Sequence, residues 1–146
     1  MAYRIVSQLT ENQISELLDL YKNEFWSNKR THQDVVQMLA ASDIIIGLVD
    51  DNEKLIGFTR LLTDFVYRAI IFDVIIKPTH RNMKLSSKLM DAVVNHPQLK
   101  SIDWIALCCL PEMIPYYERW GFTSKFSKIQ LMFRINQSNK EIANDN

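Results

Sequence analysis

The sequence lacks a net charge, because 17 Lys and Arg residues balance 17 Asp and Glu residues. A chain with this balance carries no overall field that would attract nucleic acid or an anionic membrane, so neither is predicted as a partner. It also lacks any apolar run approaching the roughly 20 residues of a membrane-spanning helix, and its first residues contain no apolar signal-peptide core. We therefore expect a cytoplasmic protein.

Cysteine is scarce, and the two cysteines, Cys108 and Cys109, are neighbours. Adjacent cysteines rarely form a disulfide because the geometry is strained, so both are predicted to be reduced thiols inside a buried strand. The sequence contains no CxxC and no Cys/His pair at metal-ligand spacing. No metal site is predicted.

What remains is the composition of an ordinary globular chain, with 47% hydrophobic and 23% charged residues in 146. This length fits one compact domain with a sizeable core. There is no internal repeat, low-complexity block or linker. We predict a single domain over residues 1–136 and a polar C-terminal tail over residues 137–146.

Hydrophobic periodicity predicts strands and helices that are interleaved but do not strictly alternate. Two of the helices begin with cap signals: Thr10 and Gln13 form a capping-box pattern, and Thr31 can cap the next helix. Strands are predicted at residues 3–6, 44–49, 55–62, 67–77, 102–109 and 129–135. Helices are predicted after Thr10 and Thr31, over residues 85–96, and over residues 111–120, with Gly121 as a left-handed cap. The order β-α-α-β-β-β-α-β-α-β indicates an α/β (α+β) fold, a mixed sheet with helices on both faces.

Two stretches add a family resemblance to this element order. Residues 73–81 read DVIIKPTHR, and residues 116–122 read YYERWGF. They resemble the V-x-P-x-x-R turn and the F-Y-E-K-x-G-F stretch of the GCN5-related N-acetyltransferase (GNAT) family. The likeness extends from about residue 3 to about residue 135. It implies the GNAT acyl-CoA N-acyltransferase fold, with acetyl-CoA as acyl donor.

Glycine is the residue most conspicuously missing under this resemblance. In the family the arginine is followed by G-x-G-I-G, whereas here Arg81 is followed by Asn82, Met83, Lys84, Leu85 and Ser86. Those glycines let the backbone approach the cofactor's pyrophosphate and turn into a helix. The resemblance implies that Arg81 and Lys84 contact the pyrophosphate and that the amides of residues 82–86 line it. The alternative is a solvated helix N-terminus with two ordinary cations.

The resemblance also implies catalytic residues. Tyr117 occupies the family's tyrosine and is the candidate acid for the leaving thiolate, since a phenol is protonated at neutral pH. Its alternative role is that of a core aromatic. Asp73 is the candidate base, with a pKa raised by partial burial. By strand parity it shares a face with Ile71 and Ile75, opposite Phe72. Its alternative role is a structural carboxylate paired with Arg60 or Arg68.

Binding residues follow from the same likeness. The backbone of Val74, Ile75 and Ile76 would lie along the pantetheine arm of acetyl-CoA and supply an oxyanion donor. The end of the first helix and the following loop, which often line the acceptor pocket in this family, contain Glu24, Phe25, Trp26 and Arg30. The alternative for this cluster is a hydrophobic helix end with charged side chains that extend to solvent.

The sequence therefore predicts an acetyl-CoA-dependent N-acetyltransferase that acts on a primary amine of a small molecule or a protein. Two alternatives remain. One is a catalytically silent GNAT domain that senses coenzyme A or docks a partner protein, which the missing glycines favour. The other is an acyltransferase for a longer acyl-CoA. The sequence does not determine the oligomeric state, although many proteins of this family dimerise through sheet edges or C-terminal strands, so a homodimer is one of the expected assemblies.

Overall fold

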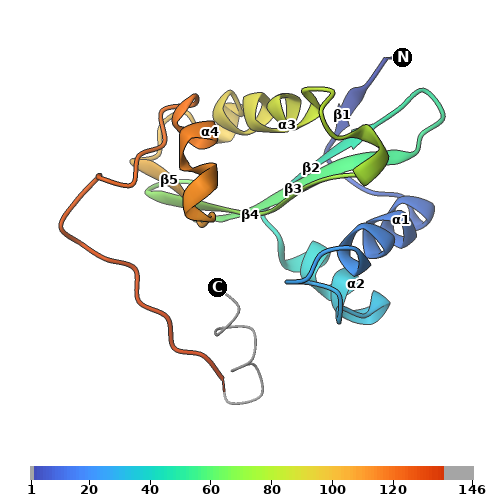
Figure 1. Ribbon diagram of the computed structural model, residues 1–146, viewed down its shortest axis with the longest axis horizontal. Coiled ribbons are helices and arrows are strands. Elements are labelled where there is room, and N and C mark those ends of the chain that lie inside the picture. Colours follow the sequence, from blue (N-terminus) through green and yellow to red (C-terminus); the bar gives the residue numbers. More distant parts are fainter. Residues whose placement is uncertain (1, 137–146) are drawn as a thin grey trace. The chain divides into compact units, whose positions relative to one another are not determined.

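The computed structural model of the chain describes residues 2–136, so the predicted tail at 137–146 lies outside the described residues. Two compact units are present, one ending at Cys108 and the other beginning at Cys109 (Figure 1). The helices and strands of the first unit are β1 (Arg4–Val6), α1 (Glu11–Lys22), α2 (His32–Ala41), β2 (Ile44–Val49), β3 (Leu55–Thr63), β4 (Arg68–Ile76), α3 (Leu85–Val94) and β5 (Trp104–Leu107). The second unit contains a 3-10 turn at Pro111–Met113 and α4 (Ile114–Glu118).

The five strands form one mixed sheet in the order β1-β2-β3-β4-β5. The first four strands pair antiparallel in sequence order, and β5 pairs parallel to β4. A parallel pair needs a crossover connection, and α3 lies in that connection. The predicted α/β class with a mixed sheet is confirmed.

Helices α1 and α2 cover one face of the sheet. Both predicted caps are present: Thr10 and Gln13 exchange the capping-box bonds, and Thr31 accepts from the Asp34 amide. Between these helices and the sheet lies a core of fully or nearly fully buried residues: Leu17, Leu20, Tyr21, Val35, Leu39, Val49, Leu55, Phe58 and Ile75. Burial of this apolar surface holds the two helices on the sheet.

Helix α3 covers the other face (Figure 1). Its buried residues are Leu85, Leu89, Met90 and Val93. Gly57 on β3 allows this close packing, because a Cβ there would lie 2.7 Å from Cδ1 of Ile76 and 3.4 Å from Cδ1 of Leu89. Helices therefore lie on both faces, as predicted. No helix within residues 2–136 is long and apolar enough to cross a membrane.

Two predictions about the C-terminal third were wrong, and a third was confirmed only in part. Strand β5 ends at Leu107, four residues in all, and both Cys108 and Cys109 are exposed instead of buried in a strand. The predicted helix at 111–120 is a 3-10 turn followed by a five-residue α4, although Gly121 has the expected positive φ of 86°.

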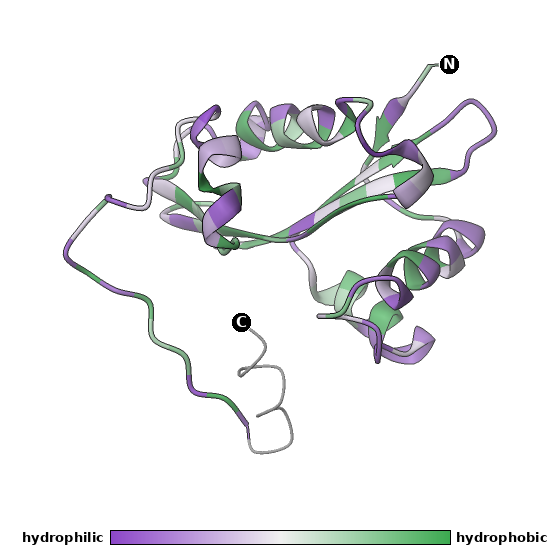
Figure 2. Ribbon diagram, in the orientation of Figure 1, coloured by the Kyte–Doolittle hydropathy of each residue, from purple (hydrophilic) through white to green (hydrophobic). Residues whose placement is uncertain are grey.

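The predicted last strand, residues 129–135, is not formed in the part of the chain that the structure describes. Its apolar side chains are exposed, Ile129 by 88% and Met132 by 89%. Figure 2 shows apolar residues along this extended segment as well as along the central strands. A strand requires a hydrogen-bonded neighbour as well as an alternating pattern, and the pattern alone led to the prediction.

Candidate functional site

Strand β4 carries a β-bulge at Asp73. The β3–β4 register shifts by one residue between Phe58, opposite Ile75, and Arg60, opposite Phe72. Asp73 has φ of 60°, a left-handed value that is uncommon for a residue other than glycine. Bulges re-aim side chains and are frequent beside active sites.

The bulge overturns one part of the parity argument for Asp73: the face shared with Ile75 is kept, but the separation from Phe72 is lost. Phe72 and Asp73 were predicted on opposite faces, yet both contact Arg60: its guanidinium lies 5.0 Å from the Phe72 ring and its Nε donates to Asp73. The extra residue breaks the period of two, so neighbours on the bulged strand reach the same side. Asp73 therefore faces α1 and α2, where Ile75 joins the core.

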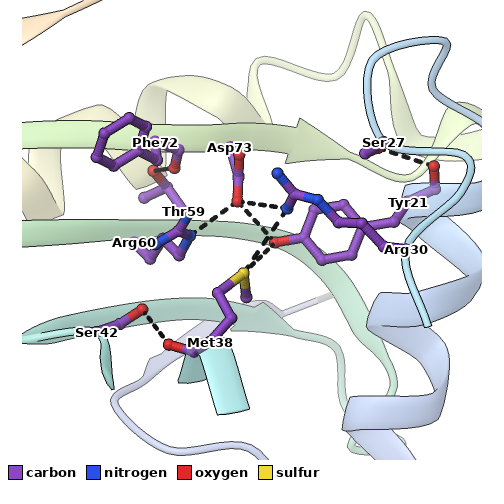
Figure 3. A network of polar contacts seen from close by, with 9 residues as sticks. All are labelled: Tyr21, Ser27, Arg30, Met38, Ser42, Thr59, Arg60, Phe72 and Asp73. Atoms are coloured by element: carbon purple, nitrogen blue, oxygen red, sulfur yellow. Dashed lines mark hydrogen bonds and ion pairs between the residues drawn. The ribbon is translucent and has the colours of Figure 1, made fainter. Parts of the chain in front are cut away.

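One carboxylate oxygen of Asp73 accepts hydrogen bonds from three donors (Figure 3). The Tyr21 hydroxyl donates at 2.9 Å, Nη1 of Arg30 at 2.9 Å, and Nε of Arg60 at 2.8 Å. The Asp73 side chain is only 6% exposed. We call these four residues, Tyr21, Arg30, Arg60 and Asp73, the Asp73 network.

The Asp73 network holds the carboxylate in its charged form. Burial by itself raises the pKa of Asp73, but the hydrogen bonds and charges of Arg30 and Arg60 outweigh it and leave the pKa below its usual value. The prediction of a raised pKa was wrong, because the sequence does not reveal two arginines on one oxygen. This geometry favours the structural alternative, with Arg60 and Arg30 as partners. Arg68 instead approaches Asp103, at 4.0 Å.

A cavity of about 320 Å³ opens beside the Asp73 network. It is lined by residues from the α1–α2 connection, α2 and β3: Arg30, Asp34, Val35, Met38 and Arg60. The thioether of Met38 also lies 3.6 Å from the Tyr21 hydroxyl and 3.7 Å from Nη1 of Arg30. The cavity thus combines two guanidinium groups, one carboxylate and two apolar side chains.

The four residues predicted to bind the acceptor lie in different environments. Trp26 packs edge-on against Tyr21 at 6.1 Å, and Arg30 lies over both rings, at 4.4 Å from Tyr21 and 5.5 Å from Trp26. Phe25 is exposed, and Glu24 accepts from Nη2 of Arg81 at 2.6 Å. Only Arg30 of this set lines the cavity.

The loop without glycines nevertheless has a glycine-like backbone. Asn82 has φ of 65° and Lys84 has φ of 58°, and these are the first two positions where the family has glycine. Lys84 is the N-cap of α3 and makes no side-chain cap hydrogen bond. The backbone therefore turns into the helix as a glycine would, with Lys84 in a conformation that costs a side-chain-bearing residue about 1–2 kcal/mol.

The other residues of this loop have distinct surroundings. The Arg81 guanidinium is shared between Glu24 and the carbonyl of Ile76, which accepts from Nε at 3.2 Å. Met83 is exposed, whereas Leu85 is buried and belongs to the α3 face of the core. Ser86 lies in the first turn of α3.

The pairing of strand β4 with β5 ends just before the bulge, at Ile71. β5 pairs with β4 only from Arg68 to Ile71, and in the described residues no strand follows on that side of residues 72–76. The predicted pantetheine-binding residues Val74, Ile75 and Ile76 lie in this part of β4. The side chain of Ile75 is buried in the core, so a ligand along this edge would be bound by backbone groups.

Tyr117 belongs to the second unit and lies on α4 among aromatic rings. The Tyr116 ring is 5.1 Å away and the Phe122 ring 6.3 Å away, both edge-on. Burial, reinforced by Tyr116 and Cys109, raises the pKa of Tyr117 to about 12. The phenol is therefore protonated at neutral pH, which suits a proton donor and equally suits a packed aromatic.

Sequence reasoning missed Tyr21, Asp34 and Met38 as parts of the site. Tyr21 fitted the apolar spacing of the first helix, and nothing in that spacing shows that its hydroxyl reaches Asp73, 52 positions away. Its chemistry is nevertheless altered: burial and the Asp73 charge raise the pKa of Tyr21 above its ordinary value.

Comparisons with known proteins identify the family. A profile described as the acetyltransferase (GNAT) family matches residues 12–122, and this match runs across both units. A protein from Pyropia yezoensis named uncharacterized N-acetyltransferase ycf52 is 31% identical over 108 residues, which cover 72% of this chain and 62% of that protein. A ycf52-like N-acetyltransferase from Prochlorococcus marinus is 31% identical over 122 residues, covering 82% of this chain and 67% of that protein.

Solved structures agree in fold. An acetyltransferase of the GNAT family from Xanthomonas campestris superposes with a TM-score of 0.79 at 24% identity, covering 93% of this chain and 94% of that one. An acetyltransferase from Deinococcus radiodurans gives a TM-score of 0.75 at 22% identity, with 94% and 91% covered. The chain spans about two thirds of the length of the curated relatives named above. Profile, relatives and fold agree, and the chain belongs to the GNAT family of acetyltransferases.

Proposed function

We propose that the chain is an acetyl-CoA-dependent N-acetyltransferase that transfers the acetyl group directly to a primary amine of a small molecule or protein. The observation that carries this proposal is the backbone of the loop before α3. Asn82 and Lys84 both keep the left-handed conformation that glycine would adopt. The missing glycines therefore do not remove the turn that brings a pyrophosphate to a helix N-terminus.

The residues of this loop and of β4 fit acetyl-CoA as a substrate. Arg81 and Lys84 supply two cations beside the N-terminus of α3, an arrangement that favours phosphate oxygens. The backbone of residues 74–76, which β5 leaves uncovered, would bind the pantetheine arm. For Arg81 to bind phosphate, its contact with Glu24 must be exchanged for the ligand, and both side chains are partly exposed.

The transfer step forms a nitrogen–carbon bond to the acetyl carbonyl carbon as the carbon–sulfur bond breaks. The amine loses one proton and the departing thiolate gains one. We assign the second proton transfer to Tyr117, whose phenol is protonated at neutral pH. Asp73 is a poor acceptor for the first, because two arginines stabilise its charged form. Water is then the acceptor of the amine proton.

Calorimetry with acetyl-CoA tests the cofactor part of the proposal. We expect the wild-type chain to bind acetyl-CoA, and Lys84→Gly and Lys84→Ala form a matched pair. Both variants remove the ammonium, but only the glycine variant also relieves the left-handed backbone. Weaker binding by both would assign the Lys84 charge to the phosphate site. Absence of wild-type binding at millimolar acetyl-CoA would refute the enzyme proposal.

Tyr117→Phe tests the catalytic part. If the phenol donates the proton, kcat falls while the dissociation constant of acetyl-CoA changes little, because only the hydroxyl is lost. An unchanged kcat would remove Tyr117 from the mechanism and leave it as a packed aromatic. A cytoplasmic location remains part of the proposal, although one relative, GCN5-related N-acetyltransferase 1 of Arabidopsis thaliana, is named as chloroplastic.

A further inference from the structure

Two of the residues that line the cavity beside the Asp73 network are arginines that share one buried carboxylate. Arg30 and Arg60 share the single carboxylate oxygen of Asp73, so two cations face one anion. The Arg60 side chain is 13% exposed and that of Arg30 is 30% exposed, so neither charge is fully hydrated. An anionic group in the cavity would balance this pair.

Both guanidinium groups retain donors for such an anion. A guanidinium has five N–H donors in a planar fork. Arg60 uses Nε on Asp73, and Arg30 uses Nη1 on Asp73 and on Met38. The described residues include no buried side-chain nitrogen or oxygen that lacks a partner, so the other nitrogens of these two arginines are not fully buried. A planar carboxylate matches the fork geometry of arginine.

The rest of the cavity wall supplies a second charge and an apolar surface. Asp34, in the first turn of α2, adds a carboxylate at an exposed position, while Val35 and Met38 contribute aliphatic surface. The cavity is thus lined by two cations, one carboxylate and two aliphatic side chains. About 320 Å³ is the size of a small-molecule pocket.

We propose that this cavity binds a zwitterionic, amino-acid-like amine as the acetyl acceptor. Arg30 and Arg60 bind the carboxylate, which keeps the amine on the neighbouring carbon at the same end of the cavity, and Val35 and Met38 contact the aliphatic part. This inference rests on the proposed acetyltransferase function and assigns its acceptor class.

The position of Asp73 connects this cavity to the proposed acetyl-CoA site. Asp73 accepts hydrogen bonds from both arginines of the cavity, and it lies in the uncovered part of β4, next to Val74. Consecutive Cα atoms are about 3.8 Å apart, so the acid-binding end lies within one residue of the pantetheine edge. Arg30 and Arg60 are thereby placed as positioning residues for the acceptor.

Binding is tested without acetyl-CoA by titrating the ¹⁵N-labelled full chain with leucine, 4-methylpentanoate and isoamylamine. The second ligand is leucine without its amine, and the third is leucine without its carboxylate. We expect leucine to shift the resonances of Arg30, Arg60, Val35 and Met38 and to bind at least tenfold more tightly than isoamylamine. Equal binding of leucine and isoamylamine would overturn the proposal. Alanine and inorganic phosphate are titrated as further probes. The proposal is also wrong if neither leucine nor alanine shifts any resonance at 100 mM, or if inorganic phosphate causes shifts and leucine does not.

Two variants and one control assign the carboxylate contact. Arg30→Gln should weaken leucine binding at least tenfold and leave isoamylamine binding unchanged, and Arg60→Gln should do the same if it folds. Arg68→Gln is the control, because Arg68 lies at the other end of β4 and approaches Asp103. If Arg30→Gln and Arg68→Gln bind leucine equally well, the assignment is wrong. The ligand series on the wild-type chain decides the question even if a variant unfolds.

Thiol release from acetyl-CoA separates this inference from the proposed function. Leucine that binds through Arg30 but causes no thiol release leaves the acid-binding site standing and refutes the acetyltransferase proposal. Thiol release that is as fast with isoamylamine as with leucine supports the acetyltransferase and refutes the acceptor class. Faster release with leucine, lost in Arg30→Gln through a raised KM, is the result expected from both together.

Discussion

Asp73→Asn removes the charge at the centre of the Asp73 network while keeping the size of the side chain. Nη1 of Arg30 and Nε of Arg60 lie 2.9 and 2.8 Å from the same oxygen, so the two nitrogens are within about 6 Å of each other. At an effective dielectric constant of about 20, two such positive charges repel by about 3 kcal/mol. Breaking a buried ion pair costs a similar amount, about 3–5 kcal/mol. Because Arg30 is partly exposed and can turn to solvent, we expect Asp73→Asn to lower the free energy of unfolding by about 3 kcal/mol, the low end of this range.

Urea denaturation at pH 7 measures this loss, with Asp103→Asn as the control. Asp103 is 63% exposed and lies 4.0 Å from Arg68, so its removal should change the free energy of unfolding by less than about 1 kcal/mol. A loss of about 3 kcal/mol corresponds to roughly 6–12 °C in Tm for a chain of this size. If the two variants are equally stable, the Asp73 network does not stabilise the fold in the way we argue.

The pH dependence supplies a second check on the same residue. The folded-state pKa of Asp73 is lowered, so its contribution is complete above the unfolded pKa of about 3.9 and is lost as pH falls through the lower folded value. The stability difference between wild type and Asp73→Asn should therefore be constant between pH 5 and 7 and shrink below about pH 4. A difference that instead disappears between pH 5 and 7 would mean that the pKa is raised, which would restore Asp73 as a candidate base.

Three further predictions concern the other parts of the chain. Lys84→Gly should raise the free energy of unfolding, measured by urea denaturation, by about 0.5–1 kcal/mol. Glycine adopts φ of 58° without strain, but its greater freedom in the unfolded chain offsets part of the gain. Lys84→Ala should give no such increase, because alanine keeps the strain. The Tyr117 hydroxyl, with a pKa of about 12, should become ionised only at very alkaline pH in an ultraviolet titration, and a pKa near 10 would contradict its burial. Leu131→Lys should convert the proposed homodimer into a monomer in light scattering, since the Leu131 side chain is 66% exposed, and an unchanged mass would contradict dimerisation through this segment.

Local features of this protein were readable from the sequence. The helix starts at Thr10 and Thr31 depend on side-chain hydrogen bonds that span three residues, and both form as predicted. Strand β2 has the predicted bounds, because a run of apolar residues ends at a turn. The GNAT resemblance of residues 73–81 and 116–122 agreed with the family that the whole chain matches.

Contacts between distant residues were decided only by the tertiary structure. The bulge at Asp73 depends on the pairing of β4 with β3, and it brings Asp73 to the same side as Phe72, which strand parity had placed opposite. The two arginines that meet Asp73 there lower its pKa, which burial alone would raise. Tyr21, Arg30, Arg60 and Asp73 meet at one oxygen although up to 52 positions separate them. The alternating pattern of residues 129–135 predicted a strand, but a strand also needs a neighbouring strand with which to form hydrogen bonds. The sequence of the segment does not reveal whether such a neighbour is available.

The glycine-less loop combines both kinds of information. The sequence by itself determined that Arg81 is followed by side-chain-bearing residues where the family has glycines. Only the tertiary structure decided that Asn82 and Lys84 adopt left-handed backbone all the same. The physical reason is that Leu85 and the next turns of α3 are buried against the sheet, and this packing stabilises the helix start by more than the strain of about 1–2 kcal/mol per residue.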